Sequence, residues 1–367
     1  MQISFIEIAV LLITILFIVL LVLFVVQSIR HHRTSAPLLL SLFLGFLAGV
    51  VTILGELLSV SVIMNYSLLA LQLNLYGFQF FFFYIFLERL ISEKINTKRY
   101  VLVVSILLIQ TFSLWATVIF LDWTEVTQIF WFFADTAYMI LGLLVFFGFG
   151  FVIYFKTYLF TRETKPIIFS IAMLIISIGF IFLGVKDCLD FFDISIPFVG
   201  YAVALGNAFF VVGLIIFTIT YVFDIDYIYR LPHNVYLLMV LTRAGIPLHI
   251  VKFKTKRNID HESDLLSGLI SAINNVFEEV FRTTASIRKI SSDDIHLLME
   301  SGEKVVCVLI TDNLSFFLTR ALKRYTKIFE QEFQLELEEN IQDSVVYNKA
   351  VELIKPIFPF FKVDKVL

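Results

Sequence analysis

The sequence predicts a membrane-embedded bundle of seven helices followed by a C-terminal α/β domain with a five-stranded antiparallel sheet. Three observations lead to this fold class. The 367 residues are 59% hydrophobic and include 42 phenylalanines, whereas a soluble globular protein is about half apolar. Seven apolar segments are long enough to cross a bilayer, which takes about 20 residues. After residue 223 the chain changes to charged segments with strand and helix periodicities.

The seven predicted spans follow one another through short loops. The first has no basic region before it and no small-x-small cleavage site after it, so it predicts a retained span and not a signal peptide. Prolines stand only at the starts of spans, and each span is therefore expected to be a continuous helix. The spans are Ile3–Ser28, Pro37–Ile63, Leu68–Leu90, Tyr100–Leu121, Thr127–Phe155, Pro166–Val185 and Ile196–Phe223.

Lysine and arginine are distributed unequally between the two sets of loops. Nine fall on one side, and only Lys186 lies on the other, among several acids. Cationic loops face the cytoplasm, so we expect a multi-pass cell-membrane protein with its N-terminus outside and its C-terminus in the cytoplasm. The nine are Arg30, Arg33, Arg89, Lys94, Lys98, Arg99, Lys156, Arg162 and Lys165.

Polar residues within the spans gather in the half of the bilayer that is predicted to be outer. Such residues are costly in lipid and are candidates for function. One hypothesis is an outward-facing pocket for a small ligand, with Lys186 paired to Glu56, Asp135 or Asp187; the alternative is that these residues hydrogen-bond the helices together. The seventh span has no lysine, which argues against a retinal Schiff base. The candidates are Glu56, Gln72, Asn74, Asp135, Lys186, Asp187 and Asn207.

The third span contains an unusual aromatic run, LYGFQFFFFYIF, from Leu75 to Phe86. Its aromatic side chains are distributed all round the predicted helix, which indicates packing and lipid contact. The Glu88-Arg89 pair that follows fits a cationic anchor at the cytoplasmic end of the span.

The predicted domain organisation is a bundle over residues 1–223, a linker over 224–235 and a cytoplasmic domain over 236–367. The domain opens with a hairpin and continues with an amphipathic helix, three strands and two helices. A cap at Asp312 or Asn313 is expected to start the longer of the two final helices. The expected elements are strands Tyr236–Thr242 and Pro247–Phe253, a helix over 264–281, strands Ser286–Ile290, Ile295–Glu300 and Lys304–Ile310, a helix to Phe333 and a helix over Asp343–Ile357.

This element order resembles the longin fold, a relative of the roadblock fold. The resemblance covers about Tyr236 to Phe358 and is carried by YLLMVLTRAGIPLHI, DLLSGLISAINNVFEEVF and KVVCVLITDNLSFFLTRALKRYTKIFEQEF. Similar segments occur in archaeal proteins with longin-like or roadblock-like modules. The resemblance implies a protein-binding adaptor that engages small GTPases or trafficking proteins, and it carries over no residue roles. Longin modules usually stand at a protein's N-terminus, whereas this one follows seven spans.

A basic stretch, Lys252, Lys254, Lys256 and Arg257, closes the second strand of the domain. It is a candidate contact with anionic lipid; a solvated hairpin end is the alternative. The histidines and the two cysteines have no metal-ligand spacing, and no nucleotide-binding or hydrolase signature occurs. We therefore expect no enzyme activity, no cofactor and no nucleic-acid partner.

Three functions remain open from the sequence. The first is a receptor-like or sensor-like protein that binds a ligand outside and a protein partner inside. The second is a transporter or channel with a regulatory domain, although no internal repeat of the kind found in transporters is visible. The third is a passive membrane anchor for the adaptor.

Overall fold

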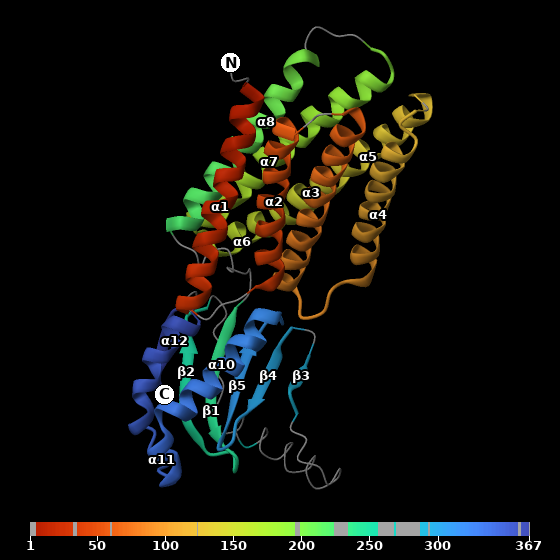
Figure 1. Ribbon diagram of the computed structural model, residues 1–367. Helices are drawn as coiled ribbons and strands as arrows, with labels where there is room; N and C mark the ends of the chain where they lie inside the picture. The colour runs from red at the N-terminus through yellow and green to blue at the C-terminus, as the bar shows by residue number, and fades with distance from the viewer. Residues whose placement is uncertain are drawn as a thin grey trace. The chain divides into compact units, whose positions relative to one another are not determined.

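The computed structural model describes residues 5–31, 35–58, 61–122, 124–194, 199–223, 234–255, 268, 287–292, 294–358 and 361–366. The chain divides into two compact units, of which one comprises Met1–Glu88 with Ile95–Pro232 and the other Arg89–Lys94 with His233–Leu367. The first unit is helical, and the second contains a sheet (Figure 1). Of the predicted linker, residues 224–233 lie outside the described residues, and the first strand begins at Val235.

Among the residues that the structure describes, seven helices of the first unit are long and apolar enough to cross a membrane, which confirms the predicted number of spans. The third span begins six residues before the predicted Leu68, and the fifth and sixth spans each end six residues later than predicted. The spans are α1 (Phe5–His31), α2 (Ala36–Leu58), α3 (Val62–Ile91), α4 (Thr97–Ile119), the composite of α5 (Thr124–Leu143), η1 (Leu144–Phe151) and α6 (Val152–Thr161), then α7 (Thr164–Phe191) and α8 (Val199–Phe223).

The fifth span is not the uniform α-helix that the sequence predicted. Its middle section, η1, is a π-helix of eight residues. On one side of this section the rings of Phe147, Phe151 and Phe155 stack in succession, with centroids 5.2 and 5.4 Å apart. A π-helical turn widens the helix and re-aims its side chains, and such turns recur at functional sites.

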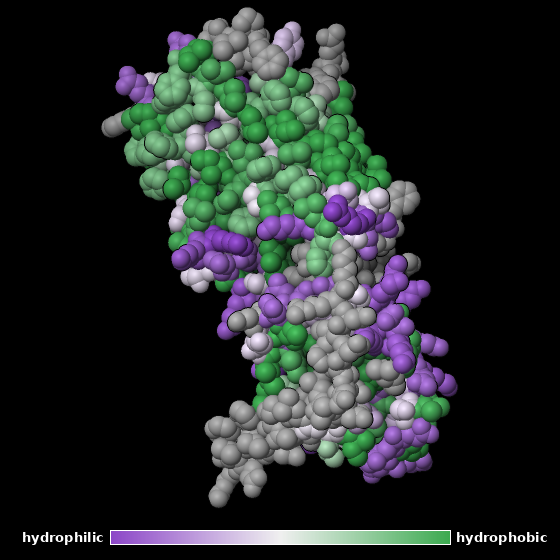
Figure 2. All heavy atoms as spheres, turned by 180° about the vertical axis from the view of Figure 1, so that it is seen from behind, coloured by the Kyte–Doolittle hydropathy of each residue, from purple (hydrophilic) through white to green (hydrophobic). Residues whose placement is uncertain are grey.

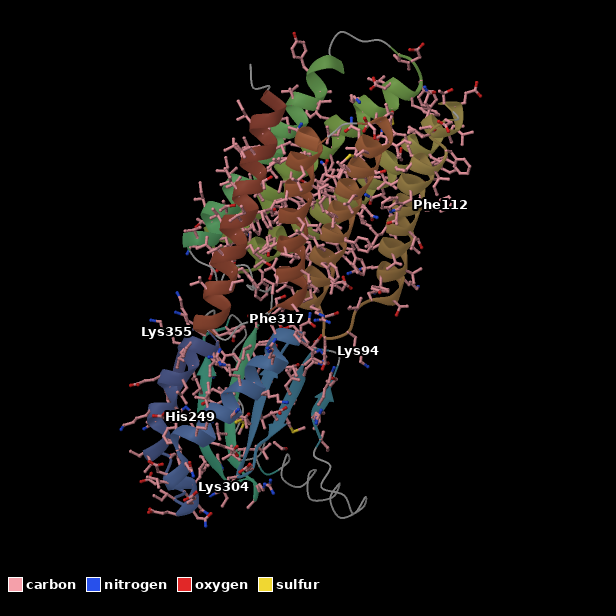
Figure 3. All side chains as sticks on the ribbon, viewed as in Figure 1. Lys94, Phe112, His249, Lys304, Phe317 and Lys355 are labelled. Carbon is pink, nitrogen blue, oxygen red and sulfur yellow. The ribbon has the colours of Figure 1, made fainter. Side chains whose placement is uncertain are left out.

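The lateral faces of the bundle are apolar, as a hydrocarbon environment requires. Figure 2 shows hydrophobic side chains over the flank of this unit. Phe112 and Ile119 of α4 are 67% and 75% exposed, and Figure 3 shows Phe112 pointing away from the neighbouring helices. In water such exposure would be unfavourable, whereas in lipid it costs nothing.

Glycines let α7 and α8 approach closely. A Cβ added at Gly179 would lie 2.9 Å from the carbonyl oxygen of Gly206, and a Cβ at Gly206 would lie 3.2 Å from that of Gly179. Small residues at a helix crossing allow this backbone contact, which drives helix association in membranes.

Glu88 joins the end of α3 to the start of α4. Its side chain is only 2% exposed, and it accepts hydrogen bonds from the Asn96 amide (3.2 Å) and from Arg99 Nη1 (3.5 Å). Asn96 in turn caps α4 by accepting from the amides of Lys98 and Arg99. Glu88 therefore fixes the α3–α4 connection.

The second unit contains an antiparallel sheet in the order β3-β4-β5-β1-β2-β6. The sheet has six strands among the described residues, one more than the five predicted, because the C-terminal segment Val363–Val366 pairs with β2. The strands are β1 (Val235–Thr242), β2 (Pro247–Phe253), β3 (Lys289–Ser291), β4 (His296–Ser301), β5 (Val305–Thr311) and β6 (Val363–Val366).

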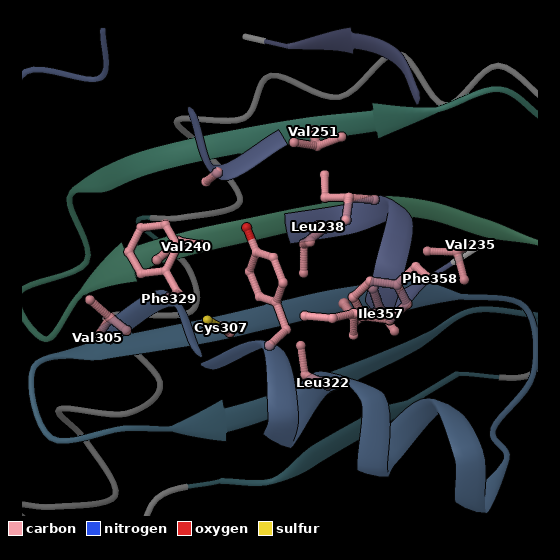
Figure 4. Close-up of a cluster of buried hydrophobic side chains, with 14 of the residues drawn as sticks. Val235, Leu238, Val240, Val251, Val305, Cys307, Leu322, Phe329, Ile357 and Phe358 are labelled. Atoms are coloured by element: carbon pink, nitrogen blue, oxygen red, sulfur yellow. The ribbon is translucent and has the colours of Figure 1, made fainter. Parts of the chain in front are cut away.

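Helices cover one face of this sheet and complete its core (Figure 4). Leu322 and Phe329 of α10 (Phe316–Glu332) pack with Cys307 and Val305 of β5. The start of α10 is capped by Ser315, which accepts from the Leu318 amide, and not by the predicted Asp312 or Asn313. Three short helical elements follow: α11 (Gln334–Glu338), η3 (Val346–Ala350) and α12 (Val351–Ile357).

The opposite face of the sheet carries a second buried apolar cluster that includes Met239, Ile250 and Val308. The helix predicted over 264–281 lies outside the described residues, apart from Gly268.

Candidate functional site

A cavity of about 410 Å³ lies among the helices of the bundle. Its volume is in the range of small-molecule pockets. Helices α1, α2, α3, α5, α7 and α8, together with η1, supply its walls. The cavity therefore draws on six of the seven spans.

The cavity is long and differs in polarity between its ends. On α7 it extends from Met173 to Asp187, a rise of about 21 Å at 1.5 Å per residue. Asp187, Lys186 and Asp135 mark one end, and Phe83 and Phe217 belong to the apolar end. The antiparallel course of the helices places the charged end toward the α7–α8 connection, which the distribution of cationic loops predicts to be outside.

The charged end contains one ion-paired cation and one unpaired acid. Lys186 Nζ lies 3.3 Å from Asp187 Oδ1 and 2.9 Å from Asp190 Oδ2. Asp187 is one of the ion-pair partners predicted for Lys186, and Asp190 is a partner that was not predicted. Asp135 has no hydrogen bond or ion pair to any part of the chain that the structure describes, although Lys186 and Asp187 are close enough to interact with it electrostatically.

Aromatic rings form the wall next to Asp135. Phe180 of α7 lies at the centre of this group, with its ring centroid 5.3 Å from Phe80, 5.6 Å from Tyr138, 5.8 Å from Phe146 and 4.7 Å from Phe210. All five side chains line the cavity. The ring faces of such a cluster attract cations as well as apolar groups.

Two glycines make room for the side chains of this wall. A Cβ at Gly142 would lie 2.4 Å from the ring of Phe180, and a Cβ at Gly45 would lie 2.8 Å from that of Phe17 and 3.0 Å from the Gln79 amide carbon. Any larger residue at these two positions would clash with Phe180, Phe17 and Gln79 where they now lie.

Five of the seven residues predicted to line a pocket surround this one cavity: Gln72, Asp135, Lys186, Asp187 and Asn207. Asn74 does not line it. Asn74 is buried and accepts a hydrogen bond of 3.0 Å from the hydroxyl of Thr111 on α4, which matches the alternative hypothesis of helix-to-helix hydrogen bonding. Glu56 lies in α2, and its side chain lies outside what the structure describes.

Sequence reasoning missed the polar and aromatic side chains of α3 that complete the site. Tyr76, Gln79, Phe80 and Phe83 line the cavity, although their run was expected to serve packing and lipid contact. Gln79 is 5% exposed, and its Oε1 atom has no hydrogen-bond partner. Their spacing from Gln72 onward repeats every three or four residues, which places them on one helix face. The recurrence of polar side chains on that face, at Gln72, Tyr76 and Gln79, was the sequence feature that could have indicated a cavity-lining face of α3.

The basic stretch of the second unit is only partly described. Lys252 lies in β2 opposite Lys365 of β6, and the Lys254 amide donates to the carbonyl of Lys362. Lys256 and Arg257 lie outside the described residues. The β2–β6 pairing thus brings two further lysines, Lys362 and Lys365, to this edge.

The second unit offers little nucleophilic chemistry in its core. Cys307 is fully buried in β5, and this burial raises the pKa of its thiol to about 12, so that it stays protonated and unreactive at neutral pH. Among the described residues, no group of three or more histidine, cysteine or acidic side chains is arranged to hold a metal ion.

Comparisons with protein-family models, with curated proteins and with solved structures found no match to this chain. The features of the chain that bear on its function are the cavity and the two-unit architecture.

Proposed function

We propose that this chain is a non-enzymatic, receptor-like membrane protein. Its bundle binds a small molecule in the central cavity from the outer side, and its C-terminal domain binds a cytoplasmic protein partner. The observation that carries the proposal is the cavity itself, where polar side chains from α3, α5, α7 and α8 gather at one end and most of the remaining lining is apolar.

The cavity polar groups differ from those that join the helices. Two hydrogen bonds join α3 to α4: one links Thr111 to Asn74, and the other runs from Gln110 Nε2 to the Leu73 carbonyl (2.9 Å). Gln79 Oε1 has no hydrogen-bond partner, Asp135 has no hydrogen bond within the described residues, and both side chains line the cavity. Gln110 Oε1 is also without a partner but lies outside the cavity lining. Because an unsatisfied polar group in an apolar environment is costly, its retention in the cavity lining is better explained by a ligand or water than by helix association.

The second unit supports the role of an adaptor by its architecture. It has a closed core of its own, in which Tyr325, Phe329 and Tyr347 are fully buried. Its five expected strands occur in the order β3-β4-β5-β1-β2. The longin resemblance suggests small GTPases or trafficking proteins as partners, and fold-level likeness is only a starting point for choosing them. Lys252 and Lys254 are proposed to contact anionic lipid headgroups.

The test uses the full chain in nanodiscs and a matched pair of substitutions on α8. Val203→Trp fills the cavity, whereas Val212→Trp adds the same bulk at a position that is 47% exposed on the same helix. The readout is capture of cytoplasmic small GTPases, each loaded with GDP or with a GTP analogue.

We expect wild-type protein to capture a GTPase in one nucleotide state, and Val203→Trp to change the captured amount several-fold while Val212→Trp leaves it unchanged. Absence of any capture would contradict the proposed partner class. Equal capture by both variants would indicate that the bundle is a passive anchor, and solute flux through the wild-type protein in liposomes would indicate a transporter.

A further inference from the structure

The polar end of the cavity has more acidic than basic side chains among the described residues. Among the described residues, Lys186 is the only cationic side chain that lines the cavity, and it is already paired with two carboxylates, Asp187 at 3.3 Å and Asp190 at 2.9 Å. Asp135 therefore has no ion-pair partner within the part of the chain that the structure describes. Within the described residues, the cavity lining holds two acidic side chains, Asp135 and Asp187, and one ammonium group, so the carboxyl group of Asp135 is available to pair with a bound monocation.

Asp135 is also placed to meet a ligand. It lies in α5 and lines the cavity in the same helix as Trp131 and Tyr138, which are one turn away on either side. Phe80, Phe180 and Phe210 continue the wall beyond Tyr138. An ammonium group beside the Asp135 carboxylate would thus be next to aromatic rings, which attract cations by their negative faces.

The remainder of the cavity indicates what the cation would be attached to. From Asp187 the lining continues along α7 past Leu183, Phe180 and Ile176 to Met173, and this is a distance of about 21 Å. The far end is bounded by apolar side chains from five other elements: Leu20, Leu38, Phe83, Phe146 and Phe217. A space that is charged at one end and apolar at the other fits an elongated ligand with a polar head and a hydrocarbon or aromatic body.

We propose that the cavity binds an amphipathic organic cation, whose ammonium group lies against Asp135 and whose apolar body extends along α3, α7 and α8. This inference depends on the proposed function, since it names the ligand class of the same site. The neutral amide of Gln79 and the hydroxyl of Ser41, which also line the cavity, would tolerate a further polar group along the body.

The experiment compares three probes that share a twelve-carbon chain: dodecyltrimethylammonium, dodecanol and dodecanoate. Full-length protein in nanodiscs carries Trp115→Phe and Trp123→Phe, so that Trp131 in the cavity wall is the remaining tryptophan. A saturable change in Trp131 fluorescence reports binding. The control with a filled cavity is Val203→Phe, because Val203→Trp would add a second tryptophan.

We expect the cation to bind about tenfold or more tightly than either other probe, which is the order of preference that a desolvated charge pair provides. Asp135→Asn should abolish this preference while dodecanol binding changes by less than about twofold, and its retained dodecanol binding also shows that the variant is folded. Asp135→Glu should keep most of the preference. Glu125→Gln removes one acid from the first turn of the same helix, outside the cavity lining, and should behave like wild type.

Two results would overturn the inference in distinguishable ways. If dodecanol or dodecanoate binds as tightly as the cation, the cavity is a ligand site but the ligand class is wrong. If none of the probes gives a saturable signal that Val203→Phe reduces, the cavity does not bind ligands of this size, and the proposed function fails with it. Should Asp135→Asn not fold, the wild-type comparison of the three probes decides the question without it.

Discussion

The two units of this protein place polar and apolar groups in opposite ways. The bundle exposes large apolar side chains such as Phe112 and encloses a cavity with Asp135, Gln79 and Lys186 in its lining. The sheet unit encloses an apolar core, and among its described residues only Ile246, Leu335 and Val345 are large, apolar and exposed. The comparison shows that each outer surface matches its solvent, lipid or water, whereas the interiors differ in kind. Both interiors contain unpaired polar atoms, such as those of His249 in the sheet unit and Gln79 in the bundle, but the bundle interior also retains a cavity.

The largest effect is expected from opening the closed core. Phe329 is fully buried, and its ring centroid lies 4.8 Å from Phe333 and 5.7 Å from Tyr347. Phe329→Ala should lower the free energy of unfolding of the sheet unit by about 3–5 kcal/mol, since a cavity forms where the ring was. Hydrogen exchange should accelerate in β5 while α7 is unchanged. Equal acceleration in both would show that the two units unfold together.

Acid should weaken the sheet unit through His249 of β2 (Figure 3). This side chain is 1% exposed, neither ring nitrogen has a hydrogen-bond partner, and burial lowers its pKa to about 4. The unfolded chain takes up this proton near pH 6.5 and the folded chain only near pH 4. Stability is therefore full above about pH 6.5 and falls as the pH falls toward 4, by about 2 kcal/mol between pH 7 and pH 5.

The control for this pH dependence is His249→Leu, which cannot take up a proton. Its unfolding midpoint in denaturant should vary less between pH 7 and pH 5 than that of wild type. An unchanged pH dependence in His249→Leu would assign the effect to other groups.

Close helix packing in the bundle should be sensitive to a single methyl group. Gly179→Ala places a Cβ within 2.9 Å of the Gly206 carbonyl, so α7 and α8 must separate, at a cost of about 1–3 kcal/mol. Gly55→Ala is the matched control, because its added Cβ meets nothing closer than 3.8 Å. Thermal unfolding in detergent should be lowered by the first change and not by the second. If both substitutions changed the unfolding temperature equally, the effect would come from the helix propensity of alanine and not from the contact between α7 and α8.

The smallest effect is expected at the turn between β4 and β5. Glu330 Oε1 accepts from the amides of Lys304 (2.7 Å) and Val305 (3.2 Å), and Figure 3 shows Lys304 at this end of the sheet. Glu330→Ala removes both bonds at a partly exposed site and should cost about 1 kcal/mol. Glu330→Gln keeps an acceptor and should cost less. If Gln and Ala are equivalent, the bonds contribute little.

Sequence reasoning located the spans because a run of about 20 apolar residues has few alternative structures. It missed β6, since VDKV is short and half charged, and its strand conformation depends on pairing with β2. It also assigned the α10 cap to Asp312 or Asn313. Asp312 instead accepts from the amide and side chain of Asn234, a contact between residues far apart in the sequence that no local pattern contains.

The cavity was predictable in its polar part only. Asp135 and Asn207 attract attention because polar residues in spans are rare. The aromatic residues that complete the site are not distinguishable from lipid-facing ones in a chain this rich in phenylalanine: Phe80 lines the cavity, whereas Phe78, two residues earlier, is 38% exposed. Nor does any sequence pattern indicate the π-helix η1, whose Phe146 belongs to the wall.

The central claim, that the bundle holds a ligand cavity reached from outside, is tested most directly by thiol accessibility. Asn207→Cys is introduced into a chain whose own cysteines, Cys188 and Cys307, are replaced by alanine, and Phe112→Cys serves as the lipid-facing control. A charged, membrane-impermeant thiol reagent is added to intact cells. The account predicts rapid modification at position 207 and none at position 112, because the reagent requires water. Failure to modify position 207 from outside, with modification only after the cytoplasmic side is opened, would contradict it.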